Sequence, residues 1–97
     1  MKIGDIVTVV TPAGEFVGEL TNDEPVILKN PRLMVSGAEG KIGFAKGIAA
    51  SGTVDPTDVM FNSYIFLTDT AETIQNGWKT HTGETKIQVP DEKTIIT

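Results

Sequence analysis

Apolar and polar residues alternate in the first third of the chain. Val7-Thr8-Val9 shows this pattern, and positions 16, 18 and 20 in Phe16-Val17-Gly18-Glu19-Leu20 share one face. A period of two residues is typical of a β-strand with one buried and one solvated face. The pattern therefore predicts three consecutive antiparallel strands, over residues 5–11, 15–20 and 26–30, the third resuming after Pro31 at 32–35.

Glycine and proline positions indicate how these strands turn and bend. Pro12 presets φ for the first central residue of a type I turn, and Gly14 suits the left-handed conformation that closes a bulged hairpin. Gly18 lies inside a strand, where glycine marks a sharp bend or a close approach of two backbones. Pro31 has no N–H to donate, so we expect it at a strand edge or a bulge. Strands that bend in this way favour a small barrel.

Residues 36–58 are rich in glycine and are expected to form a flexible insertion. Their inner part, residues 41–50, is apolar as well, which favours either a weak pair of strands or a mobile flap. Apolar segments resume after the insertion. They predict two short strands over 59–61 and 64–68, joined by a tight turn at Asn62-Ser63, and one more strand over 86–90.

One short helix is predicted after these strands. Asp69-Thr70-Ala71-Glu72 has the spacing of a capping box, in which an acceptor is followed three residues later by a glutamate. Ile74 and Trp78 then recur at helical spacing, and Gly77 is the expected stop. We therefore expect a helix of about two turns whose Trp78 packs against the barrel, with base stacking as the alternative for this side chain.

Composition limits the setting of the protein. The 97 residues fit one domain over 1–97, and the absence of cysteine excludes disulfides and thiolate metal sites. No apolar run approaches the ~20 residues of a membrane span, and the N-terminus has no signal-peptide core. The expected location is the cytoplasm, with no membrane partner.

The net charge of −5 weighs against a generic DNA coat, because neutralising phosphates is the main source of non-specific affinity. Lys29, Arg32, Lys41 and Lys46 are nevertheless close together in sequence. They are interpreted either as a nucleic-acid contact or as solvated side chains on a loop and a strand edge.

The sequence contains no recognisable arrangement of catalytic residues. The one histidine, His81, lies in a polar stretch that matches no metal motif, and residues 37–41 fail the spacing of a phosphate-binding loop. Asp55 and Asp58 occur in a common turn composition. We therefore expect no enzyme, metal or cofactor. A small-molecule or enzymatic role for the glycine-rich segment remains the weakest alternative.

The strand predicted over 64–68 carries large apolar side chains on both of its faces, and the core of one copy would cover only one of them. Tyr64 and Phe66 alternate with Ile65 and Leu67, so one face points outward or meets another subunit. These four residues are the predicted subunit interface.

The order of motifs resembles the Sm-like family, in a divergent bacterial or phage-type form. The resemblance rests on Val7-x-Val9, Gly14, Phe16-x-Gly18-x-Leu20, Asp23 and 26–30, followed by Met60-Phe61-Asn62-Ser63 and 64–67. It implies a strongly bent, five-stranded antiparallel barrel. It also implies that copies join through the fourth strand of one and the fifth strand of the next, making a homo-oligomeric ring that binds RNA. Asn22 and Asn62 lie on the loops that would line the pore of such a ring, so the resemblance implies that they contact the nucleic acid.

The resulting hypothesis is an all-β, ring-forming nucleic-acid-binding protein. It would bind single-stranded RNA, or single-stranded DNA, as a chaperone or processing accessory without catalysis. The predicted contacts are Asn22, Lys41, Lys46 and Asn62. The alternative is a structural or protein-binding scaffold, for example a phage component, with the same barrel and no nucleic-acid role.

Overall fold

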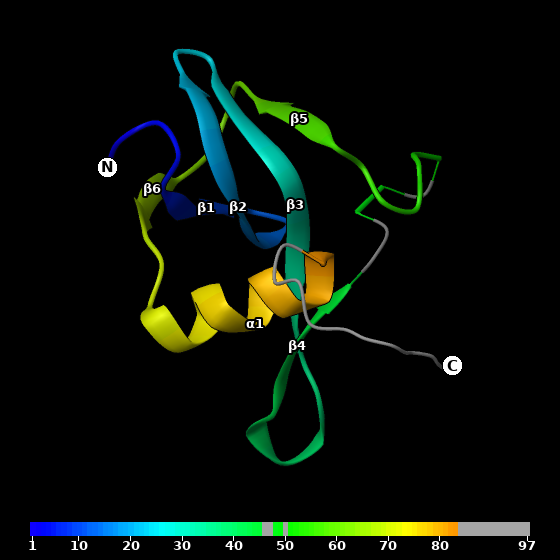
Figure 1. The fold of residues 1–97 in the computed structure, drawn as a ribbon. Helices are drawn as coiled ribbons and strands as arrows, with labels where there is room; N and C mark the ends of the chain where they lie inside the picture. The colour runs from blue at the N-terminus through cyan, green and yellow to red at the C-terminus, as the bar shows by residue number, and fades with distance from the viewer. Residues whose placement is uncertain (46–47, 50, 84–97) are drawn as a thin grey trace.

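The computed structural model describes residues 1–45, 48–49 and 51–83. Its elements are, in chain order, β1 (Ile6–Thr11), β2 (Gly14–Asp23), β3 (Val26–Ser36), the short 3-10 helix η1 (Ala38–Gly40), β4 (Ile42–Ala45), β5 (Asp58–Phe61), β6 (Phe66–Asp69) and the helix α1 (Glu72–Thr82). The strands form one antiparallel sheet in the order β4-β3-β2-β1-β6, and β5 pairs with β3 as well. The helix crosses one face of this sheet (Figure 1). The predicted mostly-β class with a short helix is confirmed.

The predicted first hairpin is confirmed. Thr11 pairs with Gly14 across a two-residue connection, Pro12-Ala13. The Thr11 hydroxyl accepts a hydrogen bond from the Ala13 N–H at 3.0 Å and donates one to the Gly14 carbonyl at 3.1 Å. Gly14 has a φ of 140°, and a Cβ there would lie 2.8 Å from the side chain of Leu33. Glycine is therefore needed at this position for both conformation and space.

Gly18 lies where the backbones of β2 and β3 approach each other closely. A Cβ at this position would lie 3.1 Å from the Leu28 side chain and 3.1 Å from two backbone atoms of the facing strand. The register between β2 and β3 also shifts between Val17 and Glu19. Both observations confirm the predicted close approach and bend, because a bulge adds local twist to a strand.

β3 continues through Pro31 and uses one edge to hold two strands. Its first part, 26–29, pairs with β5, and its last part, 33–36, pairs with β4. Asn30 and Pro31 lie between these two parts, and Asn30 has a left-handed φ of 52°. Pro31 thus occupies an irregularity where no ladder N–H is required, as predicted.

Apolar side chains form two cores, one on each face of the sheet. The first consists of Val7, Val9, Leu20, Val26 and Leu28, with Phe61 and Leu67 packed against it. The second consists of Ile6, Val17 and Trp78, with Met34, Phe44 and Ile74 packed against it. The sheet therefore wraps around the first core on its inner face and carries α1 over the second core on its outer face.

Several sequence predictions of the fold are wrong in detail. The structure has six strands rather than five, because part of the insertion, Ile42–Ala45, forms β4 beside β3. The sheet does not close into a barrel. In the part of the chain that the structure describes, β5 pairs only with β3 and β6 only with β1. No tight turn joins these two strands, because Tyr64 and Ile65 belong to the connection and β6 begins at Phe66.

The helix also differs from its prediction. The N-cap residue is Ala71 with no side-chain cap, and the helix continues through Gly77 to a left-handed Gly83. The capping box fails because its acceptor, Asp69, is the last residue of β6 and pairs with Val7 of β1, and the helix begins only at Glu72. Gly77 does not end the helix, since it packs against Phe44, where a Cβ would lie 3.4 Å from the ring. The strand predicted over 86–90 lies outside the described residues.

Candidate functional site

Two chain connections meet at one end of the sheet and form a groove. The end of β2 and the turn that follows it supply Asp23, Glu24 and Pro25, and the segment after β5 supplies Asn62 and Tyr64. Pairing of Val26 with both Asp23 and Phe61 brings these connections together. The groove has a volume of about 530 Å³ and is called the turn groove below. It contains two carboxylates and two aromatic rings, those of Phe61 and Tyr64, and none of the residues that line it is a lysine or an arginine.

The two asparagines of the predicted nucleic-acid site lie at this same end of the molecule. Asn62 is exposed and lines the turn groove. Asn22 is half-buried, and its Nδ2 donates a hydrogen bond to the Pro25 carbonyl oxygen at 2.7 Å. The side chain of Asn22 therefore shapes the turn, a common use of asparagine. Asn62 is the one of the two whose side chain borders open space in the groove.

Of the two predicted lysines, Lys41 is described by the structure and is not part of the turn groove. Lys41 is exposed and follows η1, at the opposite end of β3, where its carbonyl accepts a hydrogen bond from the Gly37 N–H at 2.6 Å. Lys46 lies outside the described residues. Lys29 is exposed on β3, facing Glu19 on one side and Asp58 on the other. One copy of the chain therefore does not bring Lys41 together with Asn22 and Asn62.

Arg32 is buried rather than solvated. Its Nη1 donates to the carbonyl oxygens of Pro31 at 2.8 Å and Pro56 at 3.3 Å, and its Nη2 lies 3.5 Å from an Asp55 carboxylate oxygen. The side chain is 6% exposed and that of Asp55 is 59% exposed. Arg32 therefore fixes the segment that leads into β5 against β3, and it is unavailable to a phosphate.

The predicted subunit interface is exposed over three consecutive residues. Tyr64, Ile65 and Phe66 are 40%, 64% and 51% exposed, whereas Leu67 is half-buried against the first core. The Ile65 N–H is bound to the Val10 carbonyl at 2.7 Å, which fixes this segment beside β1. Three large apolar side chains are thus held in solvent at the start of an edge strand.

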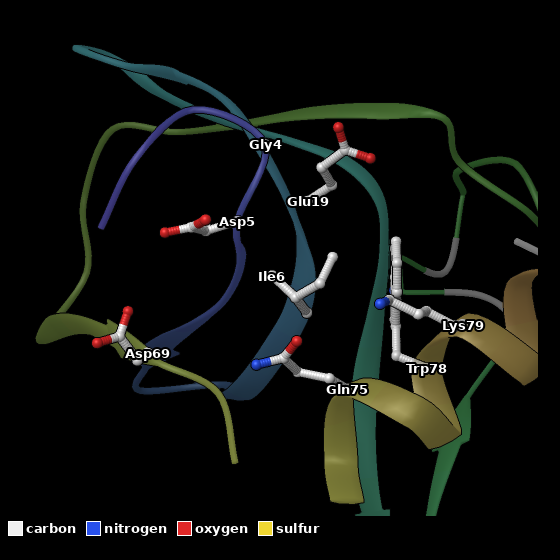
Figure 2. Close-up of a pocket in the computed structure, with 8 residues that line it drawn as sticks. All are labelled: Gly4, Asp5, Ile6, Glu19, Asp69, Gln75, Trp78 and Lys79. Carbon is white, nitrogen blue, oxygen red and sulfur yellow. The ribbon is translucent and has the colours of Figure 1, made fainter. Parts of the chain in front are cut away.

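A second cavity, which the sequence did not indicate, lies between the N-terminal segment, β2, β6 and α1. Figure 2 shows the carboxylates of Asp5, Glu19 and Asp69 around it, with Gln75, Trp78 and Lys79 contributed by the helix. Its volume is about 410 Å³. These residues come from distant parts of the chain and match no motif, so no local pattern predicts the pocket.

The polar groups of this acidic pocket are partly committed to the fold. The Asp5 carboxylate accepts a hydrogen bond from the Lys2 N–H at 2.9 Å. Gln75 Nε2 donates to the Thr70 carbonyl oxygen at 2.8 Å. The described residues contain no group of three or more histidine, cysteine, aspartate or glutamate side chains suited to holding a metal ion. The pocket is therefore a feature of the helix–sheet junction.

The imidazole ring of His81 lies 5.6 Å from the Phe44 ring, centroid to centroid, at the junction of α1 and β4.

Among residues 1–45, 48–49 and 51–83, no helix has the length and apolar character needed to cross a membrane. No family model, curated protein or solved structure matches the chain.

Proposed function

We propose that the protein is a non-enzymatic assembly module that forms a closed ring of identical copies. The observation that carries this proposal is that, among the described residues, β5 pairs with β3 only and β6 with β1 only, so that each has an unpaired edge. An unpaired edge presents free N–H and C=O groups to any strand that can add to it. The exposed side chains of Met60 on β5 and Phe66 on β6 lie at these two edges. Pairing β5 of one copy with β6 of the next satisfies the backbone and covers both side chains.

The ring follows from the geometry of the two edges. The two edges are different surfaces, so a contact between them is heterologous. Such a contact repeats from copy to copy. It gives a closed ring if the rotation that relates neighbouring copies closes, and an open filament if it does not. Within each copy, Phe61 of β5 and Leu67 of β6 pack against the same buried residues, so both strands lie around one core. The sequence motifs and this packing support the proposal that each copy is an Sm-like unit of the ring.

We infer that the ring acts as a protein-binding scaffold. The turn groove, which lies where an Sm-like ring would place its pore loops, carries Asp23 and Glu24. The net charge of −5 points in the same direction. Carboxylates repel phosphates, and nucleic-acid affinity derives mainly from lysine and arginine contacts to phosphate. A basic segment of another protein is the partner that fits this charge.

Binding of single-stranded RNA, as a chaperone or processing accessory, is the second candidate. It is favoured by Tyr64 and Asn62, which share the turn groove. Aromatic rings stack on unpaired bases, and asparagine offers both a donor and an acceptor to a base edge. In a ring, lysines from neighbouring copies would have to supply the phosphate contacts.

Size-exclusion chromatography with light scattering tests the ring. The wild-type chain is expected to elute as one oligomer at micromolar concentration, and the Phe66→Lys variant as a monomer. Ile3→Lys is the matched control, because Ile3 is similarly exposed, at 58% against 51% for Phe66, and lies before β1. A monomeric wild-type protein, or equal behaviour of the two variants, contradicts the proposal.

A further inference from the structure

The floor of the turn groove is apolar and belongs to the first core. Asp23 pairs with Val26, and Val26 pairs with Phe61, so these three side chains lie on one face of the sheet. Val26 is buried in the first core, and Phe61 packs against that core. Asp23 is exposed on the same face. The turn groove therefore opens over one end of the first core, with an apolar floor and a charged rim.

The rim combines two carboxylates with an aromatic ring. Asp23 and Glu24 are exposed, and Tyr64 is 40% exposed. Among the described residues, neither of the two carboxylates forms an ion pair. The groove volume of about 530 Å³ is within the range of about 300–1,000 Å³ that is typical of ligand pockets. The rim thus offers negative charge and a π-face to a ligand from outside the chain.

Hydrogen bonds hold both walls of the groove in place without a ligand. On one wall, Asn22 Nδ2 donates to the Pro25 carbonyl oxygen at 2.7 Å. On the other wall, the Ile65 N–H next to Tyr64 donates to the Val10 carbonyl oxygen, also at 2.7 Å. A site that is formed before binding avoids the entropy cost of ordering its own segments.

An arginine side chain has the chemistry that matches this groove. Its methylene groups suit an apolar floor, and its planar guanidinium both stacks on an aromatic ring and donates paired hydrogen bonds to a carboxylate. The ammonium group of lysine is a compact, strongly hydrated point charge and lacks this planar geometry. The net charge of −5 also favours a cationic partner.

From the floor, the rim and the net charge, we propose that the turn groove binds an arginine side chain of the partner protein. The guanidinium lies between the Tyr64 ring and the carboxylates of Asp23 and Glu24. This inference rests on the proposed scaffold function and specifies its partner. It does not depend on the ring, because the residues that line the groove all belong to one copy of the chain.

Fluorescence anisotropy with three labelled pentapeptides, at about 0.1 M salt, tests the proposal on the full chain. The peptides carry one central arginine, lysine or citrulline among glycines, and citrulline has the shape of arginine without its charge. We expect the arginine peptide to bind about threefold more tightly than the lysine peptide, the value of one cation–π contact. The citrulline peptide should bind about tenfold more weakly than the arginine peptide, because the charge-assisted hydrogen bonds are lost.

Variants of the aromatic ring assign the arginine preference to the groove. Tyr64→Leu should abolish the difference between the arginine and lysine peptides. Phe66→Leu is the matched control, because Phe66 is an exposed ring two residues away that does not line the groove, and this variant should keep the difference. The monomeric Phe66→Lys variant retains the whole groove and should bind the arginine peptide as the wild type does, which distinguishes a failure of the ring from a failure of this inference.

Variants of the carboxylates test the charge of the rim. Asp23→Asn/Glu24→Gln should weaken binding of the arginine peptide about fivefold, as expected for the loss of two exposed ion pairs. Glu15→Gln/Glu39→Gln removes two exposed carboxylates from the other ends of β2 and β3 and should leave the affinity unchanged. Equal weakening by the two double variants would mean that net charge alone attracts the peptide, and would overturn the proposed site.

Two further results would overturn the proposal. Equal affinity for the arginine and lysine peptides, or a preference that survives Tyr64→Leu, removes the arginine assignment and leaves a basic partner in place. Binding of neither cationic peptide removes both the arginine assignment and the basic partner of the proposed scaffold.

Discussion

Trp78 in α1 donates a hydrogen bond from Nε1 to the backbone carbonyl oxygen of Asn30 in β3, at 2.8 Å. The N–H of the same Asn30 donates to the Thr57 carbonyl, at 2.6 Å. Asn30 has a left-handed φ of 52° and lies between the parts of β3 that pair with β5 and β4. The irregularity in β3 is therefore the place where the helix and the segment leading into β5 are both attached to the sheet.

Replacing Trp78 tests this attachment. Trp78→Phe keeps most of the apolar volume and leaves the Asn30 carbonyl without its donor, so we expect a loss of about 1–2 kcal/mol of unfolding free energy. Trp78→Ala also opens a cavity in the second core, at a cost of about 3–5 kcal/mol. Urea denaturation followed by circular dichroism measures both, because the chain has no other tryptophan for fluorescence. Similar losses for both variants would contradict a specific role for the hydrogen bond.

Gly18 should not tolerate a methyl group. The Cβ of Gly18→Ala would meet the Leu28 side chain and two backbone atoms of β3 at 3.1 Å, so the two strands must separate or slip. We expect a destabilisation of about 1–3 kcal/mol, as for other overpacked sites. Gly37→Ala is the control, because a Cβ there meets nothing closer than 3.7 Å. Urea midpoints that are equal for the two variants would contradict the close approach.

Arg32 and Asp55 should respond very differently to substitution, although they form one ion pair. Asp55 is mostly exposed, so water and salt screen the pair, and Asp55→Asn should change stability by less than about 0.5 kcal/mol. Arg32→Ala also loses the bonds to the Pro31 and Pro56 carbonyls and leaves a cavity, so we expect a loss of about 2–3 kcal/mol. Urea denaturation of both variants checks this asymmetry. Equal losses would mean that the ion pair itself dominates.

The first three strands were predictable from sequence because their information is local. Alternation gives the buried face, and Gly14 and Gly18 occur where only glycine fits against the facing strand. Strand partners in the second half were not predictable, since short apolar runs such as 59–61 do not indicate which edge they join. The helix boundaries were missed for a tertiary reason. Asp69 pairs with Val7 as the last residue of β6, so it does not cap the helix, and Gly77 packs against Phe44 inside the helix.

The candidate site was predictable only in part, because it depends on contacts between distant parts of the chain. Asn62 and the turn after Asn22 meet at one groove because β2, β3 and β5 are neighbours, an arrangement that the order of motifs anticipated. The acidic pocket combines side chains from the N-terminal segment, β2, β6 and α1. Its existence depends on where the helix lies on the sheet, which periodicity does not specify.

Binding assays should separate the scaffold role from the RNA role. If the turn groove binds single-stranded RNA, Tyr64→Ala should weaken binding by about 1–3 kcal/mol, the value of one stacked base. Ile3→Ala, a similarly exposed apolar residue outside the groove, should leave it unchanged. Fluorescence anisotropy with short oligonucleotides at about 0.1 M salt gives the measurement. We expect the wild type to show no binding to any oligonucleotide, and a Tyr64-dependent affinity would reverse the preference for a protein partner.

Cysteine cross-linking should reveal which edges meet in the assembly. The chain has no native cysteine, and Met60 and Phe66 are exposed on β5 and β6. If β5 of one copy pairs with β6 of the next, Met60→Cys/Phe66→Cys should give a ladder of disulfide-linked multimers that ends at the size of the ring. Met60→Cys and Phe66→Cys alone should give little product, because identical residues do not face each other across a heterologous contact. Strong dimer formation by either single variant would indicate a two-fold symmetric contact and would rule out this head-to-tail arrangement.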